Sequence, residues 1–279
     1  MSASSPEFAP RGGRLAPADA AIFETFVVPR YLSLFGDLAL EAIVESDGAE
    51  VVHFGCRTGY PDRGVALRLA GARIVGLDES RAAVELARAK AATMPDMTAE
   101  YHVADGFPTS LPDGAFSHAI ALHPLAAPEE RSALIAEMAR VLAPGGQLVL
   151  AMPLRGSFGE VADLLRECSL KRDDALLAAA VDRAMAQRPT VEALSGEIEE
   201  AGFHDVDVTL RPCAVAFPNG RAFVEDPITR LLLLPEFRKN LGTEDVARPF
   251  EYVRDAIDKY WSEGDFELSV HVGCATARR

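Results

Sequence analysis

Short apolar runs alternate along the chain with longer stretches whose apolar residues follow helical spacing. The runs are rich in β-branched and aliphatic residues, which is typical of buried strands, and lie at residues 50–54, 73–77, 99–103, 116–122 and 147–152. The stretches between them predict helices at residues 62–70, 81–92 and 128–142. Strands separated by helices imply right-handed crossovers and therefore a parallel sheet.

The second half of the chain follows a different pattern. Residues 164–202 are mostly helical, and residues 206–217 and 266–277 then alternate as two strands. Residues 218–264 separate those strands and read as short helices, with the only tryptophan of the chain, Trp261. We therefore expect two closing strands with a helical insertion between them.

The N-terminal segment divides into a tail and a cover. Residues 1–15 are rich in serine, proline, glycine and arginine, which predicts a frayed tail and is unlike a secretory signal. Residues 23–45 are apolar at helical spacing and contain Pro29, which predicts two short helices or one kinked helix. The expected organisation is a tail, a helical cover (16–48), a core (49–217), an insertion acting as a lid (218–264) and a final strand (265–279).

Composition narrows the classes of function. The formal net charge of −14 argues against nucleic acid as a partner, because phosphate binding needs a basic surface. No apolar run is long enough for a membrane span. The four cysteines are far apart and lack the spacing of a metal site, so we expect reduced thiols, a cytoplasmic location and no metal.

A glycine turn follows the first strand. Residues 51–59 read Val-Val-His-Phe-Gly-Cys-Arg-Thr-Gly, so that Gly55 and Gly59 bracket a loop that a ligand can approach closely. A dinucleotide is one candidate ligand, but its fingerprint needs G-x-G-x-x-G, and the spacing of Gly55, Gly59 and Gly64 does not fit.

The glycine turn resembles the first motif of class I S-adenosylmethionine (SAM) methyltransferases, an acid-x-Gly-x-Gly-x-Gly run. Further segments resemble that family in order and spacing: Gly-Leu-Asp-Glu-Ser at 76–80, Ala-Asp-Gly at 104–106, Leu-Pro-Asp-Gly-Ala-Phe at 111–116 and Ala-Pro-Gly-Gly-Gln-Leu at 143–148. The resemblance implies a Rossmann-like α/β fold, with a seven-stranded, mostly parallel sheet, an antiparallel last strand and helices on both faces.

The resemblance also implies a SAM site at the carboxyl ends of the strands. Asp78 would accept hydrogen bonds from the ribose hydroxyls, although an acid at a helix N-terminus is an alternative interpretation. Asp105 would accept from the adenine amino group, or is a solvated turn residue beside Gly106. The residues expected around the cofactor are Tyr31, Gly55, Cys56, Arg57, Gly59, Asp78, Glu79, Asp105, Gly106 and Leu122.

Two residues depart from the family's first motif. His53 stands where the family has an acid that helps to hold the ammonium of SAM, and Arg57 stands where it has the middle glycine. A like-charge contact at about 4 Å costs up to ~4 kcal/mol at an effective dielectric of about 20. We therefore expect Arg57→Gly to tighten SAM binding and His53→Asp to tighten it further. The alternatives are that Arg57 turns outward, or pairs with the carboxylate of SAM or with an anionic substrate.

Candidate catalytic groups are fewer. His123 ends the fourth strand and is the candidate general base, although a histidine that only caps the strand before Pro124 is an alternative. Together with the resemblance, these features predict a SAM-dependent methyltransferase for a small, partly hydrophobic acceptor, and a homo-oligomer is a candidate assembly. The alternative is a degenerate methyltransferase fold that serves as a binding or regulatory module.

Overall fold

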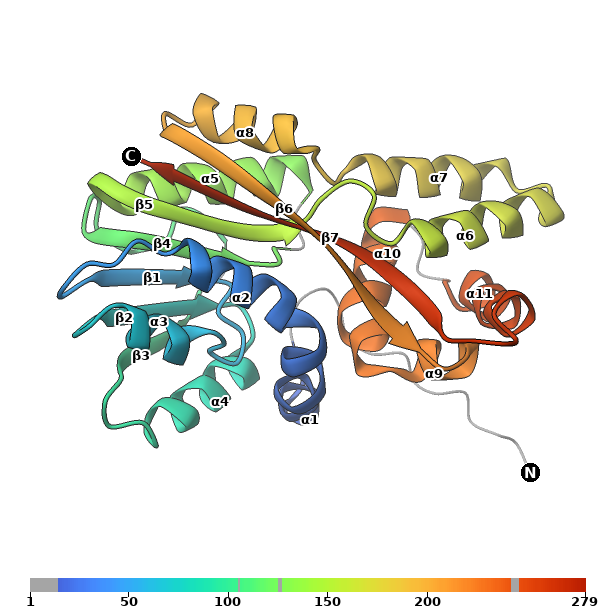
Figure 1. Cartoon of the computed structure of the whole chain (residues 1–279), viewed down its shortest axis with the longest axis horizontal. Helices are drawn as coiled ribbons and strands as arrows, with labels where there is room; N and C mark the ends of the chain where they lie inside the picture. The colour runs from blue at the N-terminus through green and yellow to red at the C-terminus, as the bar shows by residue number, and fades with distance from the viewer. Residues whose placement is uncertain (1–14, 105, 125–126, 242–245) are drawn as a thin grey trace.

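A twisted seven-stranded sheet forms the centre of the computed structural model, which describes residues 15–104, 106–124, 127–241 and 246–279 (Figure 1). The strands are β1 (Glu50–Phe54), β2 (Arg73–Asp78), β3 (Thr98–Val103), β4 (Phe116–Leu122), β5 (Leu142–Pro153), β6 (His204–Phe217) and β7 (Phe266–Arg278). Their order is β3-β2-β1-β4-β5-β7-β6. The neighbours from β3 to β5 pair in parallel, whereas β7 is antiparallel to β5 and β6, which confirms the predicted sheet.

Helices cover both faces of this sheet. On one face lie α2 (Ser33–Ala42), α3 (Asp62–Arg68) and α4 (Arg81–Ala91). On the other face lie α5 (Pro128–Val141) and α8 (Val191–Glu200). Alternate residues of a strand point to opposite faces, so Val51 packs under the first group and Val52 under the second.

The N-terminal cover is one continuous helical segment rather than two helices. It runs through α1 (Pro17–Ile22), the π-helix η1 (Phe23–Leu32) and α2. Pro29 lies inside the π-helical stretch, where the wider turn takes up the missing N–H and the bulk of the ring. The tail expected for residues 1–15 lies, except for Leu15, outside the described residues.

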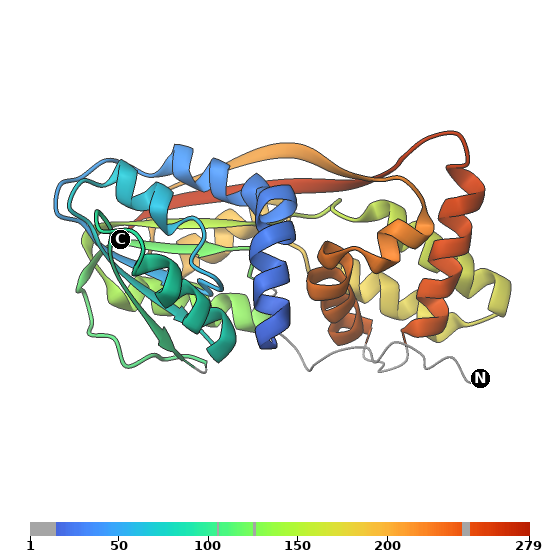
Figure 2. The same cartoon turned by 90° about the horizontal axis from the view of Figure 1, so that it is seen from below.

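A helical lobe stands beside the carboxyl ends of the parallel strands (Figures 1 and 2). Its helices are α6 (Gly159–Arg172), α7 (Ala175–Ala186), α9 (Gly220–Glu225), η2 (Thr229–Leu233), α10 (Leu234–Leu241) and α11 (Ala247–Tyr260). The sequence placed α6 and α7 with the core, but α6 packs on α11 and α7 packs on α10. The long strands β6 and β7 run from the sheet into this lobe (Figure 1).

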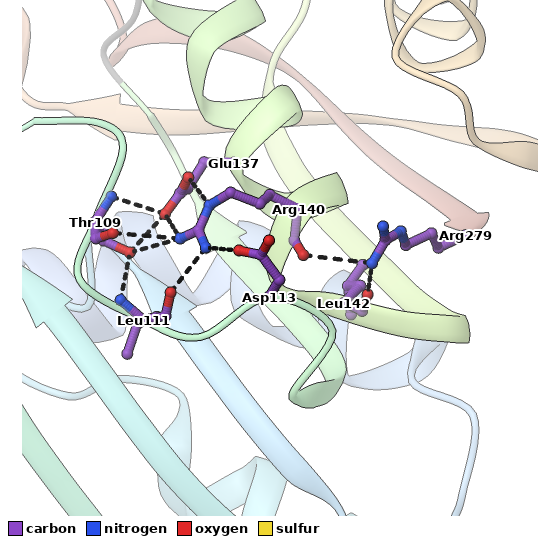
Figure 3. A network of polar contacts seen from close by, with 7 residues as sticks. All are labelled: Thr109, Leu111, Asp113, Glu137, Arg140, Leu142 and Arg279. Carbon is purple, nitrogen blue, oxygen red and sulfur yellow. Dashed lines mark hydrogen bonds and ion pairs between the residues drawn. The ribbon is translucent and has the colours of Figure 1, made fainter.

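A polar network fixes the loop between β3 and β4 against α5 (Figure 3). The buried carboxylate of Glu137 accepts hydrogen bonds from the Thr109 backbone N–H at 2.9 Å and from Arg140 Nε at 2.9 Å. Arg140 also donates to the Leu111 carbonyl at 2.8 Å and pairs with Asp113. Burial opposes ionisation of Glu137, but the hydrogen bonds from Arg140 and Thr109 outweigh it and lower the pKa of this carboxyl.

We expect Glu137→Gln to lower the free energy of unfolding by about 2 kcal/mol at pH 7, since it weakens hydrogen bonds to a buried charge. A carboxyl with a lowered pKa in the folded state stabilises the protein above its unfolded pKa of about 4.3, and this contribution is lost as pH falls through the folded pKa. Urea titration at pH 7 and near pH 4 should therefore show a difference that shrinks in acid. Glu200→Gln, at an exposed position of α8, is the control, and an equal loss in both variants would contradict the role of Glu137.

The packing of α9 against α11 leaves no room for a side chain at Gly220, whose added Cβ would lie 2.1 Å from the Arg254 carbonyl oxygen. Gly220→Ala should therefore destabilise the protein by about 1–3 kcal/mol through overpacking. Gly196 in α8 has open space around it, so Gly196→Ala should stabilise by about 0.5–1 kcal/mol through helix propensity. Thermal unfolding of both variants should give shifts of opposite sign, and a rise in melting temperature for Gly220→Ala would refute the packing.

Candidate functional site

A cavity of about 650 Å³ opens at the carboxyl ends of β1, β2 and β4 and continues to the helical lobe. In an open α/β sheet, ligands bind at this edge. The end of the cavity nearer the sheet is lined by residues that include Phe54, Gly55, Arg57, Asp78, Glu79, Gly106, Phe107 and Leu122. Met152 and Pro153 at the end of β5 also line the cavity, and the lobe side contributes Arg188, Leu231, Leu232, Pro235 and Glu236.

The loop after β1 offers its first glycine to the cavity. Gly55 has φ +64°, and an added Cβ would meet nothing within 4 Å, so a ligand can approach the backbone there. Gly59 lies on the inner side of the same loop, where a Cβ would lie 3.0 Å from the Tyr101 hydroxyl. Cys56 is buried and, like Gly59, does not line the cavity.

Asp78 ends β2 at the cavity wall. Its two carboxylate oxygens accept hydrogen bonds from the backbone N–H groups of Arg57, at 2.9 Å, and Ser80, at 2.8 Å. A carboxylate has about four acceptor positions, so both oxygens keep capacity for a ligand's hydroxyl groups. Asp78 therefore orders the glycine loop and also faces the space where the sequence places the ribose.

Arg57 turns into the site rather than outward. Its backbone is in the left-handed region, with φ +47°, where glycine is ordinarily favoured. The guanidinium donates to the carbonyl oxygens of Leu122, at 2.9 Å, and His123, at 2.8 Å, and lies 5.7 Å from the centre of the Phe23 ring. Burial lowers the pKa of Arg57, and the nearby Asp78 opposes that shift.

A buried triad lies behind the glycine loop, and the sequence did not indicate it. His53 Nδ1 and Asp62 Oδ1 share a hydrogen bond of 2.7 Å, and the Tyr101 hydroxyl donates to Asp62 Oδ2 at 2.8 Å. Burial, reinforced by Asp62, raises the pKa of Tyr101. A carboxylate thus lies beside the position of the family's acid, but it comes from the first turn of α3. An aspartate at position 53 would lie against the carboxylate of Asp62, and the two negative charges would repel each other. The structure therefore gives no support to the expectation that His53→Asp tightens SAM binding.

His123 and Tyr31 form a buried pair next to the cavity rather than on its wall. The Tyr31 hydroxyl and His123 Nε2 share a hydrogen bond of 2.8 Å, and the rings of Tyr31 and Phe35 contact the imidazole edge-on. His123 Nδ1 has no hydrogen-bond partner among the residues that the structure describes. Burial lowers the pKa of His123 well below its usual value, and the charge of Arg57 lowers it further.

Six of the predicted site residues therefore surround one cavity: Gly55, Arg57, Asp78, Glu79, Gly106 and Leu122. Asp105, the predicted adenine contact, lies outside the described residues. Leu15, at the start of the described chain, exchanges two hydrogen bonds of 3.1 Å with the Ser80 hydroxyl and lines the cavity.

The lobe contributes charged residues that the sequence gave no reason to single out. Arg188, between α7 and α8, pairs with Glu236 of α10, and both side chains are largely buried. The Arg188 guanidinium also lies 4.6 Å from the centre of the Phe158 ring. At the rim, Lys239 pairs with Glu130 at 2.6 Å. The partners lie far apart in the chain, so no local motif marks them.

Comparison with known proteins agrees with this geometry. Residues 52–150 match the family model of a methyltransferase domain. Methyltransferase GfsG of Streptomyces halstedii is 32% identical over 135 residues, which cover 47% of this chain and 48% of that protein. Trans-aconitate 2-methyltransferase of Acidovorax sp. (strain JS42) is 34% identical over 107 residues, covering 37% of this chain and 38% of that protein. The matches thus span about half or less of these curated relatives.

A solved structure shows the same fold over nearly the whole chain. Phosphoethanolamine N-methyltransferase 2 of Haemonchus contortus, in complex with SAM, superposes with a TM-score of 0.56 at 13% identity, over 95% of this chain and 57% of that one. The match over residues 52–150 shows a methyltransferase domain within this chain, and the strand order shows the Rossmann-like sheet on which that domain is built.

Proposed function

We propose that this protein transfers a methyl group from SAM to a small, partly hydrophobic acceptor. The observation that carries the proposal is the continuous cavity, which joins Gly55 and Asp78 at the sheet to an apolar wall of the lobe. Cavities of this volume commonly hold small ligands. The net charge of −14 supports a small molecule over a nucleic acid as the acceptor.

The residues at the sheet fit a nucleoside cofactor. Asp78 would accept hydrogen bonds from the ribose hydroxyls, and Gly55 would let the cofactor's amino acid arm lie against the backbone. Glu79, Gly106 and Leu122 would form the remaining walls. When bound, SAM supplies a methyl group that its sulfonium already activates, so the protein's own contribution is mainly position and proton removal.

The residues of the lobe fit the acceptor. Leu231, Leu232 and Pro235 would pack against an apolar body. We also propose His123 as the general base. Its lowered pKa keeps the ring neutral at physiological pH, which is the form that accepts a proton. In the tautomer that suits this role, Nε2–H donates to the Tyr31 hydroxyl oxygen and fixes the ring, and Nδ1 is the nitrogen left to accept the proton.

A second candidate function rests on Arg57. Its guanidinium lies in the cofactor half of the cavity and already uses the carbonyl oxygens at the end of β4. A cationic ligand would be repelled by this charge, and it would find these two carbonyl oxygens already occupied by hydrogen bonds from Arg57. The second candidate is therefore a methyltransferase fold that has lost SAM and binds another small molecule in the same cavity.

Calorimetric titration with SAM tests the proposed function. We expect the parent protein to bind SAM and Asp78→Ala to bind at least about tenfold more weakly, which corresponds to about 1.4 kcal/mol. Glu85→Ala, which removes an exposed carboxylate from the following helix α4, is the control and should leave the affinity unchanged. A parent without measurable affinity for SAM would refute methyl transfer, and equal affinity of the parent and Asp78→Ala would refute the ribose contact.

The second titration compares Arg57→Gly with Arg57→Lys. Glycine adopts the left-handed backbone of position 57 without strain and removes the positive charge. It also frees the Leu122 and His123 carbonyl oxygens for the ammonium of SAM. We therefore expect Arg57→Gly to bind SAM about tenfold more tightly. Lysine keeps the charge but not the planar pair of donors, so it should bind no better than the parent. Weaker binding by Arg57→Gly would instead make Arg57 part of a working site.

A further inference from the structure

The ion pair between Arg188 and Glu236 is a polar patch on the lobe end of the cavity. Arg188 is 5% exposed and Glu236 is 10% exposed, and both line the cavity. Their neighbours on this wall are Leu231, Leu232 and Pro235. A buried ion pair among apolar residues adds little to stability, because the desolvation of two charges offsets their attraction.

This pair does not use its full hydrogen-bonding capacity. Arg188 Nε and Glu236 Oε2 are buried and have no hydrogen-bond partner within the described part of the chain. A buried polar atom without a partner is destabilising, and native proteins seldom contain one. A donor and an acceptor therefore stand unsatisfied on two residues that meet at the cavity wall, which is what a ligand group with both a donor and an acceptor would complete.

The charge of the cavity indicates which kind of group fits. Its described lining residues include three basic side chains, Arg57, Arg188 and Lys239, and four acidic ones, Asp78, Glu79, Glu130 and Glu236. SAM carries a sulfonium, an ammonium and a carboxylate, and so a net charge of one positive unit. Among the described lining residues the acidic side chains exceed the basic ones by one, which matches the charge of SAM and leaves no spare counter-charge there for an acceptor with a net charge of its own.

We propose that the Arg188–Glu236 pair binds a hydroxyl group on an uncharged, otherwise apolar acceptor. A hydroxyl donates one hydrogen bond and accepts two, so it can donate to the Glu236 carboxylate and accept from the Arg188 guanidinium at once. A carboxylate can only accept and would face Glu236, whereas an ammonium can only donate and would face Arg188. The inference rests on the proposed function, because it names the acceptor class of the same cavity.

Four probes with one hydrocarbon body test this inference: 4-ethylbenzyl alcohol, 4-ethylbenzoate, 4-ethylbenzylamine and 4-ethyltoluene. Their affinities are measured by ligand-observed NMR, with and without saturating S-adenosylhomocysteine, which occupies the cofactor half without allowing turnover. The alcohol should bind the parent at least about fivefold more tightly than each of the other three. A preference for the benzoate or the amine, or no discrimination among the four, would overturn the proposal.

The double variant Arg188→Met/Glu236→Leu removes both charges together, because a single substitution would leave the partner buried and unpaired. Replacing a buried ion pair by apolar side chains of similar volume is often neutral for stability. In this variant the alcohol should lose its advantage, while 4-ethyltoluene binds at least as well as before. The control is Arg166→Gln/Asp182→Asn, which removes an exposed ion pair of the lobe and should leave the order of the probes unchanged. An alcohol preference that survives Arg188→Met/Glu236→Leu would also overturn the proposal.

The affinity for S-adenosylhomocysteine separates this inference from the proposed function. It should be the same in the parent and in Arg188→Met/Glu236→Leu, since both residues lie at the lobe end of the cavity. A parent that does not bind S-adenosylhomocysteine but still prefers the alcohol would refute methyl transfer and retain the hydroxyl site. A parent that binds S-adenosylhomocysteine without the alcohol preference would refute only the hydroxyl site.

Discussion

Two hydrogen bonds from one guanidinium determine how the glycine loop meets the sheet. Arg57 donates to the carbonyl oxygens of Leu122 and His123, and so joins the turn after β1 to the end of β4. The Arg57 backbone N–H donates in turn to Asp78, which adds the end of β2. Arg57 therefore contacts the ends of three strands around the cavity; its backbone bond to Asp78 does not depend on the side chain, whereas the two bonds to β4 and the positive charge do.

The local pattern of the sequence predicted the sheet because each strand carries its own signal. Residues 116–122 form a strand with the predicted bounds, and the closing pair is antiparallel as expected. That Gly55, Asp78 and Gly106 line one cavity was also predictable, since each lies at or just after the end of a strand and the carboxyl ends of parallel strands share one edge.

The lobe end of the cavity was not predictable, because its contacts join distant segments. Arg188 and Glu236 are separated by the whole of β6, and nothing near either residue indicates a partner. Asp62 was missed for a related reason, since an acid in the first turn of a helix is ordinarily read as a favourable partner of the helix dipole. The side-chain direction of Arg57 depends on the β4 carbonyl groups, which no local pattern reveals.

The place of β7 within the sheet has a consequence for synthesis on the ribosome. β7 lies between β5 and β6, although it follows β6 and the intervening lobe helices in the chain. During translation β6 therefore emerges before the strand that joins it to the sheet, and its backbone groups have no strand partner until β7 has been made. The backbone of β6 stays unpaired for the time needed to translate α9 to α11. During that interval a holdase chaperone can bind the exposed β6 segment of the nascent chain.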